Sequence, residues 1–199
     1  MAQAGVKARS RRRESVFGER FAVFAECLLT GVWIAVACLG VVTYPAAFAA
    51  GARHLRRRTT HEDGGLRKFV TDFRTALRGG WVVGLAGWAA AGVVRLDVVA
   101  VRAGLPGGPF VGAVGVLALI GLAVALLRAA AVWAPDRAWR ALLADAVRRT
   151  VLDPAGSFLV VCGLAVVTAS ALLVAPLAVP VLGAVAAAAV AVEERYRHR

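Results

Sequence analysis

The sequence has few charged residues for its length. Only 18% of its 199 residues are charged and 60% are apolar, whereas soluble globular proteins contain about 25% charged and about 45–50% apolar residues. A water-soluble fold of this length has too little interior to bury so much hydrocarbon. The composition therefore excludes a soluble nucleic-acid-binding protein and an intrinsically disordered chain.

The sequence also has few cysteines and lacks the motifs of common enzymes. Cys27, Cys38 and Cys162 lie within apolar stretches and show no zinc or redox spacing, which also excludes a secreted disulfide scaffold. There is no Walker loop, nucleophile elbow, kinase signature or spaced set of metal ligands. We therefore expect no catalytic residue, no cofactor and no metal site, and we expect that the protein is not an enzyme.

Long apolar runs dominate what is present. A helix needs about 20 mostly apolar residues to cross about 30 Å of hydrocarbon, and four regions meet this requirement: residues 21–42, 81–101, 110–133 and 158–192. The last region is long enough for two helices and contains Pro176 and Pro180, so it predicts a hairpin that turns near residue 175. With a mean hydropathy of +0.72, the pattern is typical of a membrane protein with several spans.

The positive charges lie between the apolar runs. The net charge is +12, and nearly all of the 24 Lys and Arg residues lie in residues 1–20, 51–80, 135–156 and near the C-terminus. Basic loops stay on the cytoplasmic side of a membrane, so we expect all four segments there. The chain must then cross and return before residue 55. This predicts a turn that contains Thr43 and Pro45, followed by a short helix that is either a thin tilted span or a re-entrant element.

These expectations define one architecture. The predicted fold is an all-α polytopic transmembrane helical bundle with about five spans, the short helix, and two cytoplasmic amphipathic helices. Residues 1–20 are expected to form a basic cytoplasmic N-terminal tail, residues 21–192 a single transmembrane domain, and residues 193–199 a basic cytoplasmic C-terminal tail. The outer loops are minimal, which leaves little surface on that side for a receptor or enzyme domain.

Two predicted cytoplasmic segments show helical periodicity. In residues 66–77 and 136–153 the apolar side chains recur at spacings of three and four, and the basic side chains take the other side. Such helices either rest on anionic lipid headgroups or dock a cytoplasmic partner. The candidate residues for a partner or lipid interface are Phe69, Phe73, Arg74, Trp139, Arg140, Arg148 and Arg149.

Ionisable residues inside apolar runs are candidates for function because a charge at membrane depth is costly. Glu26 lies about 8 Å below the inner end of its predicted helix. There it can pair with a nearby basic residue, pair with another helix, or take part in ion or proton coupling. Asp97 lies two residues from Arg95 and so does not face it on a helix; we expect both at the outer interface.

The order of the motifs resembles a known family. The first span ends in Cys38-Leu-Gly-Val-Val-Thr-Tyr-Pro45, a short alanine-rich helix leads to basic residues, and Phe69-Val-Thr-Asp-Phe-Arg-Thr-Ala-Leu77 enters the next span. Together with Leu142-Leu-Ala-Asp-Ala-Val-Arg-Arg-Thr-Val-Leu-Asp-Pro154 before an apolar hairpin, this order resembles the YesL-like family of small bacterial membrane proteins over about residues 18–195. In that family the turn usually has Pro before the Thr, whereas here Pro45 follows Thr43.

The resemblance implies a modest set of functional expectations. The family is a domain of unknown function, often encoded near carbohydrate-uptake ABC transporters, and it brings no catalytic residue. It implies a non-enzymatic accessory or regulatory component of carbohydrate uptake in the bacterial cytoplasmic membrane, and the distribution of basic residues predicts that both termini are cytoplasmic. The partners would be the lipid bilayer, carbohydrate ABC transporter subunits and a homo-oligomer, and no nucleic acid. The alternative is a small self-contained transporter or channel, which the proline-interrupted helices favour because such helices often frame substrate sites.

Overall fold

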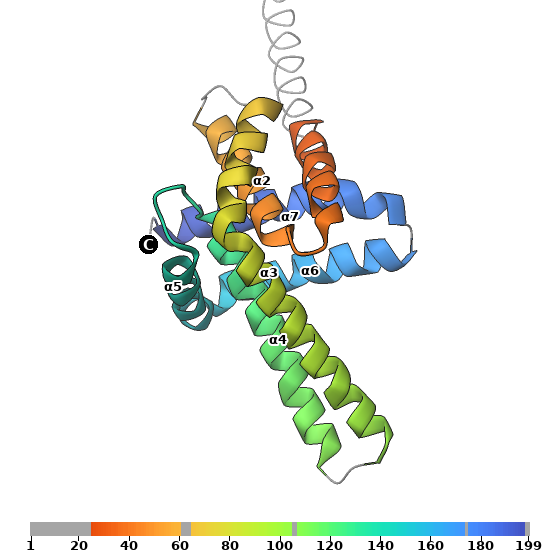
Figure 1. The fold of residues 1–199 in the computed structure, drawn as a ribbon. Coiled ribbons are helices and arrows are strands. Elements are labelled where there is room, and N and C mark those ends of the chain that lie inside the picture. The colour runs from red at the N-terminus through yellow and green to blue at the C-terminus, as the bar shows by residue number, and fades with distance from the viewer. Residues whose placement is uncertain (1–24, 61–64, 105–106, 174, 198–199) are drawn as a thin grey trace, which may run out of the picture.

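The computed structural model describes residues 25–60, 65–104, 107–173 and 175–197. This part of the chain is helical and contains no strand, which confirms the predicted all-α class. The predicted tail over residues 1–20 lies outside the described residues. An N-terminal helix, Ala25–Gly40, ends in the 3-10 turn η1, Cys38–Gly40. The helices that follow are α2 (Tyr44–Thr59), α3 (Leu66–Arg102), α4 (Gly108–Ala131), α5 (Trp139–Leu152), α6 (Pro154–Leu173) and α7 (Ala175–Arg197) (Figure 1).

Helix α2 lies at the centre of the packing. Its first half is rich in alanine, and Ala46, Ala47, Ala49 and Ala50 are all fully buried. Helices α3, α4 and α7 all pack against it. Small side chains allow the backbones of neighbouring helices to approach closely, so this short segment can be enclosed on several sides.

Helix α3 is longer than the sequence pattern predicts. It has 37 residues, which corresponds to about 55 Å. We predicted an interfacial helix over residues 66–77 and a separate span from residue 81. This prediction is wrong, because α3 continues through Gly79 and Gly80. A glycine inside a helix usually costs about 1 kcal/mol. Here the missing side chains allow Trp139 to lie against Gly79 and Ala46 against Gly80.

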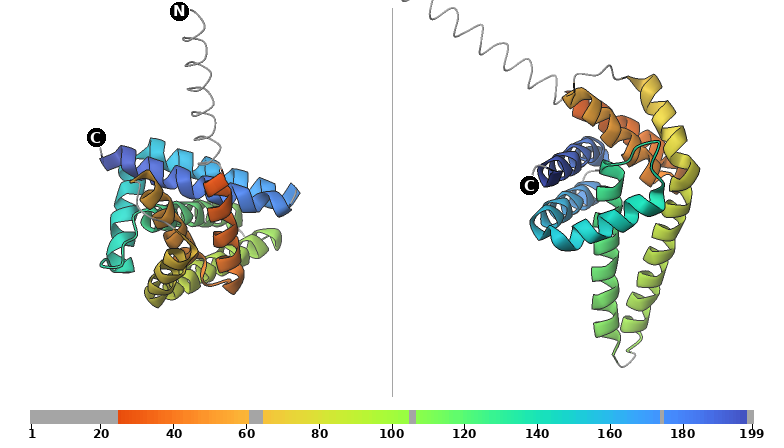
Figure 2. Two further views of the ribbon diagram at one scale, coloured as in Figure 1. Left: turned by 90° about the horizontal axis from the view of Figure 1, so that it is seen from above. Right: turned by 90° about the vertical axis from the view of Figure 1, so that its left-hand side faces the viewer.

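Two helical hairpins cross in the structure. The second half of α3 and the first half of α4 form one hairpin, which projects from the remaining helices (Figure 1). We refer to residues 85–104 and 107–120 as the arm. Helices α6 and α7 form the second hairpin, which runs across the first hairpin rather than alongside it (Figure 2). Helix α5 connects the end of α4 to the start of α6.

Three helices in the described part of the chain are long and apolar enough to cross a membrane: α3, α4 and α6. Three of the five expected spans therefore correspond to helices that could cross a membrane, and the other two are not confirmed. In the first predicted span, residues 21–24 lie outside the described residues, and the described helix Ala25–Gly40 is too short to count. The second half of α2 is basic, and α7 is not among the three.

The turn between the N-terminal helix and α2 is held by a contact from α3 and by a local hydrogen bond. Val41 has a positive φ of 57°, a strained conformation for a β-branched residue. Its carbonyl oxygen accepts a hydrogen bond from Trp88 Nε1 at 2.9 Å. Thr43 donates to the carbonyl oxygen of Ala37 at 2.5 Å. Pro45 lies in the first turn of α2, where its missing N–H is not needed.

The close approach of α3 to this turn can be tested at Gly84. A Cβ at Gly84 would collide with the carbonyl oxygen of Val42, and overpacking typically costs about 1–3 kcal/mol. We expect Gly84→Ala to lower the thermal unfolding midpoint of the protein in detergent. The control is Gly92→Ala on the same helix, where a Cβ meets open space. Equal midpoints for the two variants would contradict this packing.

Candidate functional site

Four charged side chains tie together the ends of α4, α5, α6 and α7. Arg128 on α4 is fully buried. Its guanidinium donates to Glu193 Oε1 at 2.6 Å, to Asp153 Oδ2 at 3.2 Å and to Ser157 Oγ at 3.1 Å. Further hydrogen bonds reach the carbonyl oxygens of Arg149 and Asp153. We refer to Arg128, Arg149, Asp153 and Glu193 as the ionic cluster.

The ionic cluster is electrically balanced. Arg149 donates to the second carboxylate oxygen of Glu193, so two guanidinium groups face two carboxylates. Asp153 and Glu193 are only 5% and 2% exposed. Taking an ion out of water costs several kcal/mol unless a partner and further hydrogen bonds compensate. The cluster supplies both, and it therefore joins four helices without leaving a net buried charge.

Asp153 also determines where α6 begins. Its Oδ1 accepts a hydrogen bond from the backbone N–H of Gly156 at 3.2 Å, which is the N-cap interaction of a helix that starts at Pro154. Proline suits the first helical position because its missing N–H would have no partner there. Since the same side chain binds Arg128, it fixes the start of α6 relative to α4.

A second cluster joins the N-terminal helix to α2. His54 is fully buried, and its Nε2 lies 2.7 Å from Glu26 Oε1. Arg58 donates to the same oxygen from Nε at 3.0 Å. The ring of Trp33 packs edge-on against the His54 ring, with 5.0 Å between centroids. Glu26 therefore links the N-terminal helix to α2. The other ring nitrogen of His54, Nδ1, has no hydrogen-bond partner within the described residues.

Asp72 provides a third ionic contact, between α2 and α3. Arg57 donates to its two oxygens at 2.5 and 3.3 Å, and Arg53 lies 3.1 Å from Asp72 Oδ1. Asp72 is 5% exposed. Bidentate contact with an arginine is the strong form of such a pair, so α2 and the first part of α3 are held in register.

Arg56 binds the C-terminal end of α4. It donates to the carbonyl oxygens of Ala131 and Trp133 at 2.6 and 2.5 Å. The last carbonyl groups of a helix have no partner within the helix, and a cation is favourable at that end. The basic run of α2 is therefore engaged in contacts within the protein.

Several candidate interface residues lie inside the protein. Phe69 and Trp139 are 3% and 8% exposed. Phe69 packs on Trp33 with 5.4 Å between ring centroids, and Trp139 donates to the Ala76 carbonyl oxygen at 2.9 Å. Arg149 belongs to the ionic cluster. These three residues are corrections to the expected lipid or partner surface, because the apolar face that the periodicity identifies is covered by other helices.

The remaining candidates are divided between core and surface. Phe73 is partly buried and packs against the main core. Asp97 is half-buried on α3, and a Cβ at Gly115 of α4 would lie 2.9 Å from its carboxylate. The residues of the expected interface that stay exposed are Arg74, Arg140 and Arg148.

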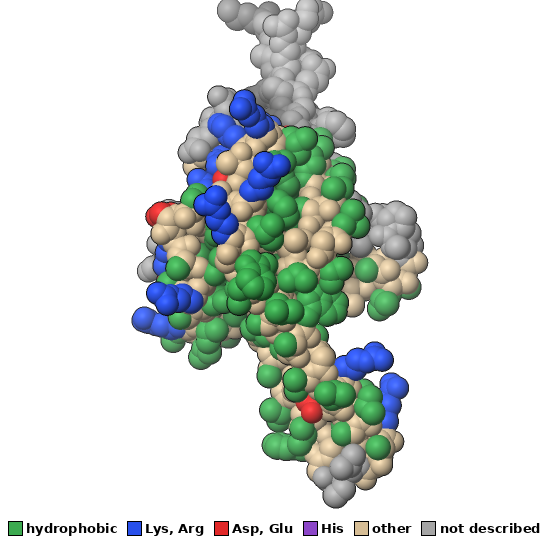
Figure 3. All heavy atoms as spheres, in the orientation of Figure 1, with side chains coloured by type: hydrophobic (Ala, Val, Ile, Leu, Met, Phe, Trp, Pro, Cys, Tyr) green, Lys and Arg blue, Asp and Glu red, His purple; other side chains and the backbone are tan. Residues whose placement is uncertain are grey.

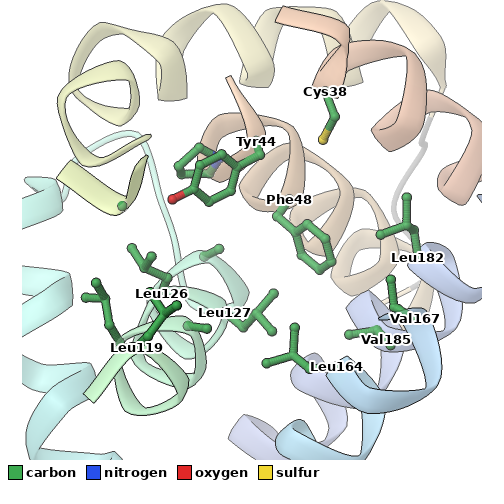
Figure 4. Close-up of a pocket in the computed structure, with 15 residues that line it drawn as sticks. Cys38, Tyr44, Phe48, Leu119, Leu126, Leu127, Leu164, Val167, Leu182 and Val185 are labelled. Carbon is green, nitrogen blue, oxygen red and sulfur yellow. The ribbon is translucent and has the colours of Figure 1, made fainter. Parts of the chain in front are cut away.

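An apolar cavity of about 300 Å³ lies where the two hairpins meet α2. Figure 4 shows Phe48 from α2, Leu127 from α4 and Leu164 from α6 around this space. Tyr44 places its hydroxyl against Gly87, where a Cβ would collide with it. Pockets with mostly apolar walls and few polar groups bind ligands that are largely hydrocarbon.

Neither the clusters nor the cavity offer the arrangement that a metal needs. Within the described residues, no group of three or more His, Cys, Asp or Glu side chains is placed to hold a metal ion. The charged groups are instead paired with one another, as in a structural contact between helices. These ion pairs hold the ends of helices together.

Sequence patterns did not reveal the ionic cluster, although a signal was present. Arg128 lies within an apolar run and precedes Ala-Ala-Ala-Val-Trp133, so its charge requires a partner at membrane depth. Asp153 and Glu193 end segments that the predicted topology brings to the same side. Within the expected tail over residues 193–199, α7 continues to Arg197 and Glu193 is buried.

The chain matches no protein family, no curated protein and no solved structure. The likeness to the YesL-like family therefore rests on the sequence motifs alone.

The ionic cluster predicts a large effect at Arg128. Arg128→Met would leave two buried carboxylates with one guanidinium, and breaking a buried pair typically costs about 3–5 kcal/mol. We expect a lower thermal unfolding midpoint in detergent and a smaller yield of folded protein. Arg102→Met is the matched control, since Arg102 is exposed near the end of the arm. A variant at Arg128 as stable as this control would contradict the role of the cluster.

Proposed function

We propose that this chain is a non-enzymatic, multi-pass protein of the bacterial cytoplasmic membrane that acts as an accessory component of carbohydrate uptake. The observation that carries the proposal is the separation of charge and hydrocarbon over the surface. Figure 3 shows most Lys and Arg side chains of this face over the upper and left part of the molecule and a smaller group on the projecting arm, with apolar side chains over much of the remainder. The link to carbohydrate uptake rests on the likeness to the YesL-like family.

Exposed hydrocarbon on the arm supports membrane insertion. Leu96, Phe110 and Leu117 are 69%, 76% and 69% exposed. A soluble protein rarely exposes large continuous apolar patches, whereas lipid is a favourable surrounding for them. Arg95 and Arg102 lie near the tip of the arm, where long basic side chains can reach the outer headgroups.

The ionic contacts support an orientation with both termini in the cytoplasm. The contacts gather the start of the N-terminal helix, the end of α2, the start of α3, the end of α4 and the end of α7. These are the ends that the positive-inside rule assigns to one side. In this topology α3 and α4 span the membrane, α2 re-enters between them, and α6 and α7 form an oblique second hairpin.

The outer face of α5 supports an accessory role. Val147, Val151 and Leu152 are 52%, 75% and 58% exposed, and Arg148 is exposed beside them. The opposite face of α5 is fixed by Trp139 and the ionic cluster. A rigid helix with a mixed basic and apolar outer face suits a docking surface for a membrane-associated subunit.

A self-contained transporter is the second candidate. Glu26 and Pro180 favoured it at the level of the sequence, but Glu26 is paired with His54 and Arg58. The cavity between the hairpins has apolar walls, which suit a hydrocarbon ligand better than a sugar or an ion. The accessory role is therefore the better-supported proposal.

The proposed topology predicts opposite labelling of two sites. The background variant has Cys27, Cys38 and Cys162, all free thiols, replaced by Ala. In this background Ala103→Cys should react with a membrane-impermeant maleimide in intact cells, because it lies at the tip of the arm. Arg148→Cys should react only after the cells are permeabilised. Labelling of both sites from the same side would overturn the topology.

The accessory role predicts a docking defect on α5. We expect Arg148→Glu with Val151→Ser to reduce recovery of ABC transporter subunits about thirtyfold, the effect of losing one interface hot spot of about 2 kcal/mol. The measurement is a crosslinked pull-down of the tagged protein from cells grown on polysaccharide, with mass spectrometry. Arg78→Glu, at an exposed position on α3 outside the candidate interface, is the control. Recovery of the bait alone from the wild type would favour the transporter instead.

A further inference from the structure

Two hollows in the structure are neighbours. The first is the cavity of about 300 Å³ at Tyr44, and the second is a groove of about 440 Å³ between α3, α4 and α5. Gly87, Leu122 and Leu126 line both of them. The groove and the cavity are therefore adjacent: the groove lies beside α5, and the cavity lies beneath α2 on the other side of these shared residues.

The α5 end of the groove differs chemically from the rest. Trp139, Arg140 and Gly79 line it. Arg140 is exposed and adds a guanidinium to walls that are otherwise almost entirely apolar. Tryptophan beside a basic residue is typical of the level at which lipid headgroups meet hydrocarbon. This end of the groove therefore combines a cationic contact with access to an apolar slot.

The depth of the space suits a hydrocarbon chain. From Gly79 to Gly87 the wall of α3 runs about 12 Å, away from the end where Arg140 lies. Next to Gly87 lies the separate apolar cavity between α4, α6 and α7, lined by Leu126, Leu164 and Val185 (Figure 4). A flexible acyl chain can follow such a path, whereas a rigid polar solute would meet no hydrogen-bond partners along its walls.

We infer that the groove is a binding site for an anionic phospholipid of the surrounding bilayer. Arg140 binds the phosphate, and one acyl chain lies along α3 from Gly79 to Gly87, where the groove borders the cavity at Tyr44. Arginine forms strong charge-assisted hydrogen bonds with phosphate oxygens, which complements the charge of an anionic lipid. The inference rests on the proposed membrane insertion and adds a specific ligand site to it.

The site can be tested by lipid competition. The full-length protein is placed in nanodiscs that contain phosphatidylglycerol and phosphatidylcholine in equal amounts, with identical acyl chains. It is then released into mild detergent, and native mass spectrometry counts the lipids that remain bound. We expect the wild type to retain phosphatidylglycerol preferentially. Arg140→Gln should weaken this retention about tenfold, as expected for one lost hydrogen bond to a charged group.

Matched variants separate the site from general effects. Arg148→Gln, which removes an exposed charge from the same helix but not from the groove, should retain the preference. Ala86→Phe should fill the groove and displace both lipids. Ala89→Phe should have no effect, because Ala89 is also exposed on α3 but does not line either hollow.

The outcomes distinguish this inference from the proposed function. Normal entry into nanodiscs with equal retention of the two lipids would overturn the lipid site alone. A protein that does not enter nanodiscs would overturn both the site and the membrane proposal. If Ala86→Phe instead removes a second copy of the chain from the spectrum, the groove is a dimer interface and the inference is wrong.

Discussion

The arrangement of the last four helices depends on the burial of one guanidinium group. Arg128 is fully buried. A buried ion without partners costs several kcal/mol, which is a large fraction of the folding free energy of a domain. Its N–H groups therefore require oxygens from α5, α6 and α7, and those helix ends have to meet around α4. Arg149 then balances the charge that Asp153 and Glu193 bring.

Two different kinds of contact hold the helices, and they occur at different places. Ionic contacts join the helix ends, where backbone carbonyl and N–H groups also need partners. Glycine and alanine dominate where helices cross, as at Gly84 against the turn and along the first half of α2. Small residues permit close crossings but fill little volume. The apolar space near Tyr44 lies where the two hairpins diverge from these close contacts.

The hydropathy pattern predicted the positions of several helices, but it did not predict which elements pack against them. The run over residues 110–133 corresponds to α4, Gly108–Ala131, and the chain turns between α6 and α7 where the hairpin was expected. The periodicity around Phe69 and Trp139 identified a buried face, but periodicity does not say which element covers it. The continuity of α3 through Gly79 and Gly80 was hidden because glycine weakens helix propensity. The partners of Arg128 depend on tertiary contacts that no local pattern encodes.

The central place of α2 has a consequence for how the protein is made. Its N-terminal half is enclosed by helices that follow it in the chain, among them α7, and its C-terminal half carries four arginines. These later helices supply contacts that bury α2, so α2 cannot reach its buried position until they are present. A chain that ends before α7 would therefore leave part of the alanine-rich half of α2 uncovered.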